Sequence, residues 1–87
     1  MAVHEVSAIV PEGVGLHARP AALFVQQAAG FTSAIQLTCG DRTADGKSIL
    51  GVLQLGATAG STVQVRAEGD DAEQAATTLA AFIRASS

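Results

Sequence analysis

The sequence predicts an α+β domain in which three helices cover one face of a four-stranded antiparallel sheet. Apolar residues alternate at period two in several short runs, they recur at helical spacing in others, and Gly, Pro and Asp residues separate the runs. The resulting order is strand, helix, strand, strand, helix, strand, helix. A chain of 87 residues forms one small core, so residues 1–87 are expected to fold as a single domain with its helices on one sheet face.

The first half of the chain contains three strands and a helix. Residues 3–10 alternate as a strand, and the Pro11-Glu12-Gly13 cluster ends it. Residues 18–29 follow a helical pattern with an apolar stripe of Ala22, Val25 and Ala29, and Gly30 stands where a left-handed residue would end the helix. Residues 33–39 and 42–44 flank the turn signal Gly40-Asp41, which predicts a hairpin.

The second half adds one strand between two helices. Residues 48–55 are too densely apolar for a single stripe, which favours a short helix with apolar groups on more than one side. Residues 61–67 alternate as the fourth strand. The last helix is expected to begin near Asp70, which forms a capping-box-like pair with Glu73. Its apolar positions are Ala72, Ala76, Leu79, Phe82 and Ile83. On the opposite, wet face of the sheet we expect Ser7, Thr38, Gln64 and Arg66.

Composition and charge exclude several classes of function. The net charge is −3, aromatics are 3% of the chain and no basic run occurs, so nucleic acid is not an expected partner. The single cysteine, Cys39, can form neither an internal disulfide nor a thiolate metal site, and no carboxylate cluster suggests a metal. No apolar window approaches membrane-spanning length, and the start has no signal-peptide pattern, so we expect a soluble cytoplasmic domain without membrane insertion.

A reactive segment is predicted around His17, directly before the first helix. The first amides of a helix lack internal partners and carry the positive end of its dipole, so an anion is favoured there. Arg19 adds a permanent cation, and the amides of Ala18 and Arg19 are the expected donors because Pro20 has no N–H. These positive surroundings favour a neutral imidazole, which can attack phosphorus and hold the product as a phosphohistidine. The simpler alternative is that His17 only caps the helix and that Arg19 is a solvated charge with no functional role.

Two segments resemble a known family, the phosphocarrier protein HPr of the bacterial sugar phosphotransferase system. Residues 15–21, with the sequence GLHARPA, look like its active-site segment without a mismatch, and residues 45–56, DGKSILGVLQLG, look like its second signature at the expected separation. The resemblance spans essentially the whole chain. It implies an open-faced sandwich whose four-stranded antiparallel sheet has the order 1-4-2-3.

The resemblance also implies a relay. The Nδ1 atom of His17 would accept a phosphoryl group from phosphorylated enzyme I and donate it to a histidine of a sugar-specific IIA protein, with Arg19 supporting the group during transfer. The chain would then be a stoichiometric carrier without a cofactor rather than an enzyme with its own small substrate. Regulation at Ser48 is implied as well, because in some lineages an HPr kinase/phosphorylase modifies the matching serine and promotes a complex with a transcriptional regulator.

A carrier that meets several partners needs an exposed docking surface, and we expect a monomer to suffice. The predicted docking residues are Ala22, Leu23, Gln26, Lys47, Ile49, Leu50 and Leu53. Within the short helix, Val52 and Leu55 are expected to be buried and Leu50 to be the most exposed. Ser48 is expected to cap this helix through its hydroxyl.

Alternatives to a sugar-transport carrier remain open in the sequence. One is a paralogue that serves a regulatory or nitrogen-related phosphorelay, and the presence of His17 argues against a purely regulatory form. The other is a non-catalytic protein-binding module in which both segments match by accident. His4 and Cys39 are expected to be a surface residue and a half-buried inert thiol, respectively.

Overall fold

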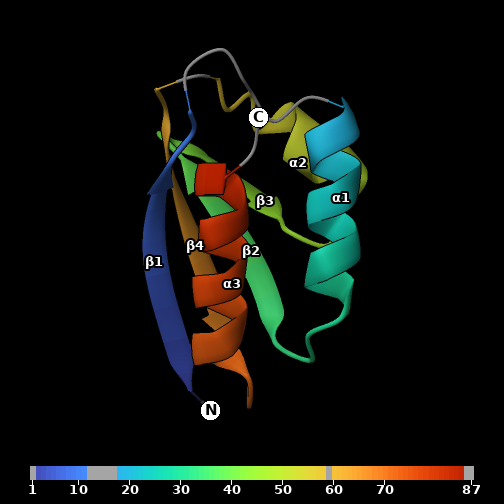
Figure 1. Cartoon of the computed structure of the whole chain (residues 1–87), viewed down its shortest axis with the longest axis vertical. Helices are drawn as coiled ribbons and strands as arrows, with labels where there is room; N and C mark the ends of the chain where they lie inside the picture. The colour runs from blue at the N-terminus through green and yellow to red at the C-terminus, as the bar shows by residue number, and fades with distance from the viewer. Residues whose placement is uncertain (1, 12–17, 59, 86–87) are drawn as a thin grey trace.

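The computed structural model describes residues 2–11, 18–58 and 60–85, and over 18–20 it describes the backbone alone. Over these ranges the chain forms four strands and three helices in the predicted order (Figure 1). The elements are β1 (Val3–Ile9), α1 (Ala18–Ala29), β2 (Ala34–Cys39), β3 (Arg42–Asp45), α2 (Ile49–Gln54), β4 (Thr62–Glu68) and α3 (Ala72–Ala85).

The strands form one antiparallel sheet with the order β1-β4-β2-β3, as the resemblance implied. In the register, Val65 of β4 stands between Val6 of β1 and Leu37 of β2. These three side chains share the face that the helices cover. A row of uncharged polar residues crosses the opposite face: Ser7, Gln64, Thr38 and Thr43. Arg66 is also on that open face and exposed, which confirms the predicted wet side of the sheet.

The core lies between the sheet and the helices, and α3 packs over β1 and β4 while α1 lies beside α2 (Figure 1). The buried face of α1 differs from the predicted stripe by one residue. It consists of Ala21, Phe24 and Ala28, whereas Ala29 is exposed and Ala22 and Val25 are half-buried. Either set satisfies helical spacing. Phe24 decides between them because its ring packs edge-on against Phe82 of α3, with centroids 6.1 Å apart.

The C-terminal end of α1 also differs from the prediction. Gly30 is not left-handed, because positive φ angles among the described residues occur only at other glycines. The helix instead tightens in its last turn, where the amides of Gly30 and Phe31 donate to carbonyls three residues back, at 3.1 Å each. The carbonyl of Phe31 is then bound by the ammonium of Lys47 at 2.8 Å. A side chain from the loop before α2 therefore holds the segment that directly follows α1.

The start of α3 is held by a contact that its own sequence does not predict. The helix begins after Asp71, one residue later than the Asp70–Glu73 pair suggested. The carboxylate of Asp71 accepts hydrogen bonds from the amides of Thr32 and Ser33, at 2.9 Å each, and from the Ser33 hydroxyl. Asp71 therefore fastens the loop between α1 and β2 to the start of α3 rather than capping its own helix.

Candidate phosphoryl-transfer and docking site

The predicted reactive segment meets the described structure at the first residue of α1. This helix begins at Ala18, directly after His17 in the sequence. The backbone amides of Ala18 and Arg19 therefore belong to the first helical turn, where N–H groups have no partner within the helix. His17 itself and the side chain of Arg19 lie outside the described residues, so their predicted contacts with a phosphoryl group stay predictions.

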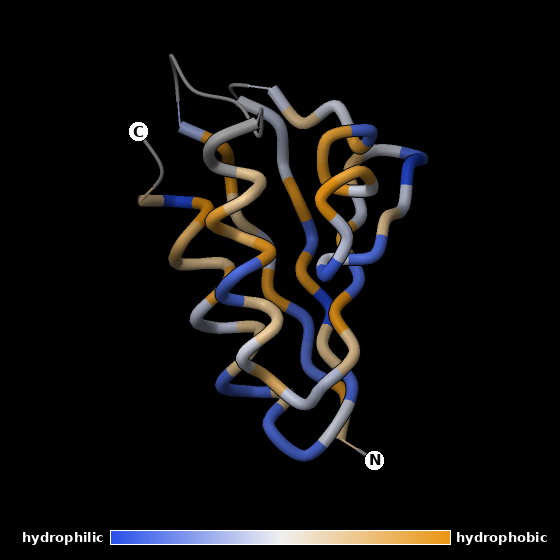
Figure 2. The backbone as a smooth tube through the Cα atoms, turned by 90° about the vertical axis from the view of Figure 1, so that its right-hand side faces the viewer, coloured by the Kyte–Doolittle hydropathy of each residue, from blue (hydrophilic) through white to orange (hydrophobic). Residues whose placement is uncertain are grey.

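Six of the seven predicted docking residues lie on two helices that pack against each other, α1 and α2, and Lys47 lies in the loop before α2. Four aliphatic side chains on these helices are exposed, and we call them the aliphatic patch: Leu23 (45%), Ile49 (47%), Leu50 (65%) and Leu53 (37%). Of the other predicted docking residues on α1, Gln26 is exposed and Ala22 is half-buried. Figure 2 shows most of α2 as hydrophobic. An exposed aliphatic group of this kind is typical of a surface that meets another protein.

The two faces of α2 divide as the sequence predicted. Val52 is fully buried and Leu55 is 3% exposed, while Leu50 is the most exposed large apolar side chain among the described residues. The helix packs between α1 and β3, which explains why a six-residue helix carries apolar groups on more than one side. Burial accounts for Val52 and Leu55, and it leaves Leu50 without a role in the core.

Ser48 caps α2, as predicted. Its backbone is extended and its hydroxyl accepts a hydrogen bond from the amide of Gly51 at 3.1 Å. The loop before it is fixed by the carboxylate of Asp45, which accepts from the Lys47 amide at 2.9 Å, and by the absence of a side chain at Gly46. A Cβ atom at Gly46 would collide with the side chain of Ile35. The cap hydroxyl is therefore held in a defined place on a half-buried residue.

Lys47 was predicted to contact partners, and the structure gives it a second role. It is half-buried, and its ammonium donates to the Phe31 carbonyl at the end of α1. The residue next to the Ser48 cap thus connects the start of α2 with the end of α1. Sequence reasoning could not find this contact because the two residues are 16 positions apart.

Asp71 has the one strongly shifted carboxyl among the described residues. The Ser33 hydroxyl and then the Thr32 amide, which donate to the charged form, lower the pKa of Asp71 from its ordinary value of 3.8 to about 2. The contact spans 38 residues and has no local sequence signal. It is a structural anchor, remote in sequence from His17 and from α2.

Clusters of metal-ligating side chains are absent from the part of the chain that the structure describes. Among residues 2–11, 18–58 and 60–85, no three His, Cys, Asp or Glu side chains gather closely enough to hold a metal ion. Over the same ranges, no helix has the length and apolar character needed to cross a bilayer. Cys39 is half-buried, and His4 is partly exposed on β1.

Comparisons with known proteins place the chain in a family. The family model described as the PTS HPr component phosphorylation site matches residues 4–85. The HPr-like protein Crh of Halalkalibacterium halodurans is 46% identical over 69 residues, which cover 79% of this chain and 82% of that protein. A multiphosphoryl transfer protein of Xanthomonas campestris pv. campestris is 50% identical over 58 residues, or 67% of this chain, but the match spans only 7% of that longer protein.

Solved structures agree with the family model. The crystal structure of the phosphocarrier protein HPr from Bacillus anthracis superposes with a TM-score of 0.89 at 40% identity, and the match covers 95% of this chain and 99% of that one. The shared sheet order, the three helices and the matched residues 4–85 lead to one conclusion. The chain belongs to the HPr family of the phosphotransferase system and is an HPr-type phosphocarrier protein.

Proposed function

We propose that the chain, acting as one domain and as a monomer, carries a phosphoryl group on His17 from phosphorylated enzyme I to a sugar-specific IIA protein. The observation that supports this most is that α1 begins at Ala18, so that His17 directly precedes the unpaired amides of a helix in a chain of the HPr family. The family assignment supports interaction with phosphotransferase-system proteins, and the two named partners are the finer part of the proposal.

The chemical step is a nucleophilic displacement at phosphorus. The lone pair of Nδ1 on a neutral His17 imidazole forms the new N–P bond while the bond from phosphorus to the donor breaks, and the donor keeps that electron pair. In a second displacement, a histidine of the IIA protein forms a new N–P bond while the N–P bond of His17 breaks, and Nδ1 keeps that electron pair, so His17 returns to its neutral state. No water and no redox partner are needed, so the carrier is regenerated after each exchange.

The surroundings proposed for the phosphoryl group follow from its charge. The amides of Ala18 and Arg19 in the first turn of α1 would donate to the phosphoryl oxygens, and the Arg19 guanidinium would pair with them. Each such contact gains strength as negative charge collects on the oxygens. Arg19 is therefore expected to speed transfer more than it strengthens docking.

The aliphatic patch would hold the partner during the exchange. Its four exposed side chains offer a small apolar area, which suits a contact that must form and break in every cycle. The neighbouring residues Ala22, Gln26 and Lys47 would border the contact. Lys47 would do so with its stem, because its ammonium is engaged by the Phe31 carbonyl.

A second function, regulation at Ser48, is favoured by two observations. Relatives of this chain include HPr-like Crh proteins, and Crh of Bacillus subtilis, whose solution structure resembles this one, is described as the catabolite repression HPr. In this chain the Ser48 hydroxyl stands at the start of α2. We propose that an HPr kinase/phosphorylase modifies it, that the new charge weakens docking at the adjoining patch, and that the modified form binds a transcriptional regulator.

The test of the main proposal is incubation with phosphoenolpyruvate and purified enzyme I. Acid-labile phosphate on wild type, absent from His17→Ala, is the expected result, and transfer to a IIA protein should follow. Circular dichroism of His17→Ala controls for folding. A folded wild-type chain that takes up no phosphate would overturn the proposal and would favour a binding module without phosphoryl chemistry.

A further inference from the structure

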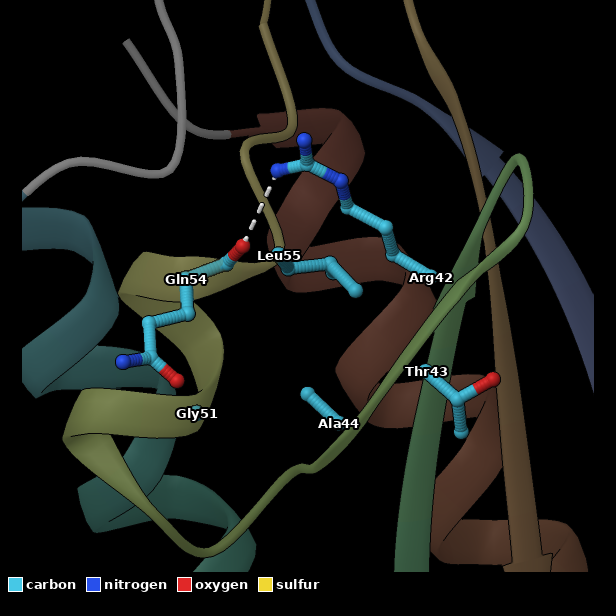
Figure 3. Close-up of a pocket in the computed structure, with 6 residues that line it drawn as sticks. All are labelled: Arg42, Thr43, Ala44, Gly51, Gln54 and Leu55. Carbon is cyan, nitrogen blue, oxygen red and sulfur yellow. Dashed lines mark hydrogen bonds between the residues drawn. The ribbon is translucent and has the colours of Figure 1, made fainter.

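A hollow of about 340 Å³ lies between β3 and the end of α2, on the side of α2 that faces the hairpin (Figure 3). Its lining residues are Arg42, Thr43, Ala44, Gly51, Gln54 and Leu55. Strand register explains why Arg42 reaches this place. Ala44 pairs with the buried Leu37 and Arg42 with Cys39, so both β3 side chains point to the helix side of the sheet. Ala44 and Gly51 are small, and they leave the space open.

Arg42 has no carboxylate partner among the residues that the structure describes. Its Nη1 donates to the backbone carbonyl of Gln54 at 3.4 Å, a long bond, and the one ion pair among the described residues joins Arg66 to Glu68. Because α2 has no basic residue in its last turn, Arg42 supplies the positive charge that the end of that helix favours. This role uses one N–H group. The remaining donors of the guanidinium fork have no hydrogen-bond partner within residues 2–11, 18–58 and 60–85, and they match the two oxygens of a carboxylate.

The occupant is best sought on another protein rather than free in solution. One exposed guanidinium pairs weakly with a single carboxylate, so a small free ligand would not be retained. A carboxylate carried by a protein that is already docked next to the hollow is different, because its effective concentration is high. Gln54, which lines the hollow, directly follows Leu53 of the aliphatic patch.

We infer that the partner held by the aliphatic patch inserts an aspartate or glutamate side chain into this hollow and contacts Arg42 through both carboxylate oxygens. Gln54 also lines the hollow, and its backbone carbonyl holds the Arg42 guanidinium at the side of the hollow next to α2 (Figure 3). This inference rests on the proposed function and names the chemistry of the partner. It adds a charged contact on the hairpin side of α2 to the apolar contact on its exposed side.

The test compares Arg42→Gln with Arg84→Gln. The control is closely matched, since the exposed Arg84 of α3 also donates one long bond to a backbone carbonyl, that of Ser7 of β1 at 3.3 Å. Initial rates of phosphorylation by enzyme I, and of transfer to a IIA protein, are measured against the concentration of the chain. Arg42→Gln is expected to raise KM by about two- to fivefold with at least one partner. The effect should shrink at high salt, and kcat should not change.

Two kinetic results would contradict the inference, and a separate measurement covers the case of a variant that does not fold. Equal KM values for the two variants with both partners would overturn the inference while leaving the carrier function intact. A wild-type chain that accepts no phosphate would remove the carrier function and the inference together. If Arg42→Gln fails to fold, wild type labelled with ¹⁵N answers the question: the Arg42 Nε–H signal should shift when unphosphorylated enzyme I or IIA protein is added, and a signal unmoved by either would overturn the inference.

Discussion

The contrast between Leu50 and Val52 gives the sharpest test of how α2 serves both core and docking. Leu50→Ala should leave the free energy of unfolding within about 0.5 kcal/mol, because 65% of this side chain is already in water. Val52 is fully buried, so Val52→Ala removes about 1.6 kcal/mol of transfer free energy and leaves a cavity, for a total of about 2–3 kcal/mol. The melting temperature of the Val52→Ala variant should fall by roughly 10–20 °C.

Phosphoryl exchange should respond in the opposite sense. Full burial of a leucine contributes about 1.5–3 kcal/mol, and roughly two thirds of Leu50 remains to be buried, so the docked complex loses about 1–2 kcal/mol in Leu50→Ala. That loss corresponds to a KM increase of about 5- to 30-fold with enzyme I. Val52→Ala, assayed below its melting temperature, should keep a KM near that of wild type.

The assays are thermal unfolding followed by circular dichroism and initial rates of phosphorylation at several carrier concentrations. An unchanged KM in Leu50→Ala would refute the docking role of the patch. A loss of stability in Leu50→Ala equal to that in Val52→Ala would refute the division of α2 into a buried and an exposed face.

Three further predictions concern residues that hold the fold together. Gly69→Ala should lower the free energy of unfolding by about 2–4 kcal/mol, because its Cβ would lie 2.6–2.8 Å from Ser33 atoms at a φ of 151°. Gly40→Ala is the control: its φ is 63° but its Cβ would meet open space, so it should lose only about 1 kcal/mol. Urea unfolding of the two variants measures the difference. Asp71→Asn should make the free energy of unfolding depend less on pH in acid. The pKa of the Asp71 carboxyl is lowered to about 2, so its contribution to stability is complete above about pH 4 and is lost as pH falls toward 2. An equally steep loss of stability with falling pH in wild type and variant would contradict this. Ser48→Ala should cost about 0.5–2 kcal/mol through loss of the α2 cap, measured by urea unfolding, and a variant as stable as wild type would deny the cap a role.

Local patterns were enough to predict most elements, and the reasons are visible in particular residues. Alternation along β4 and the separation of Leu50 from Val52 on α2 depend only on neighbours in sequence. The stripe of α1 was wrong by one position because alanines occupy both candidate registers, and only the contact of Phe24 with Phe82 selects one of them.

Contacts between distant segments could not be predicted in the same way. The Asp71 bonds to the loop after α1, the Lys47 bond to the end of that helix and the Arg42 bond to Gln54 join residues 12 to 39 positions apart. Each depends on where the sheet and helices bring the chain together. The motif around His17 was recognisable from sequence, while the chemistry proposed for it depends on side chains outside the described residues.

The position of β4 in the sheet affects how the chain can fold during synthesis. This strand lies between β1 and β2, yet it follows both along the chain, and the paired residues Val3 of β1 and Glu68 of β4 are separated by most of the sequence. A nascent chain therefore leaves the ribosome with two unpaired strand edges and a gap between them. Cooperative folding has to wait until residue 68 has emerged, and until then the exposed edges need protection from pairing with other chains.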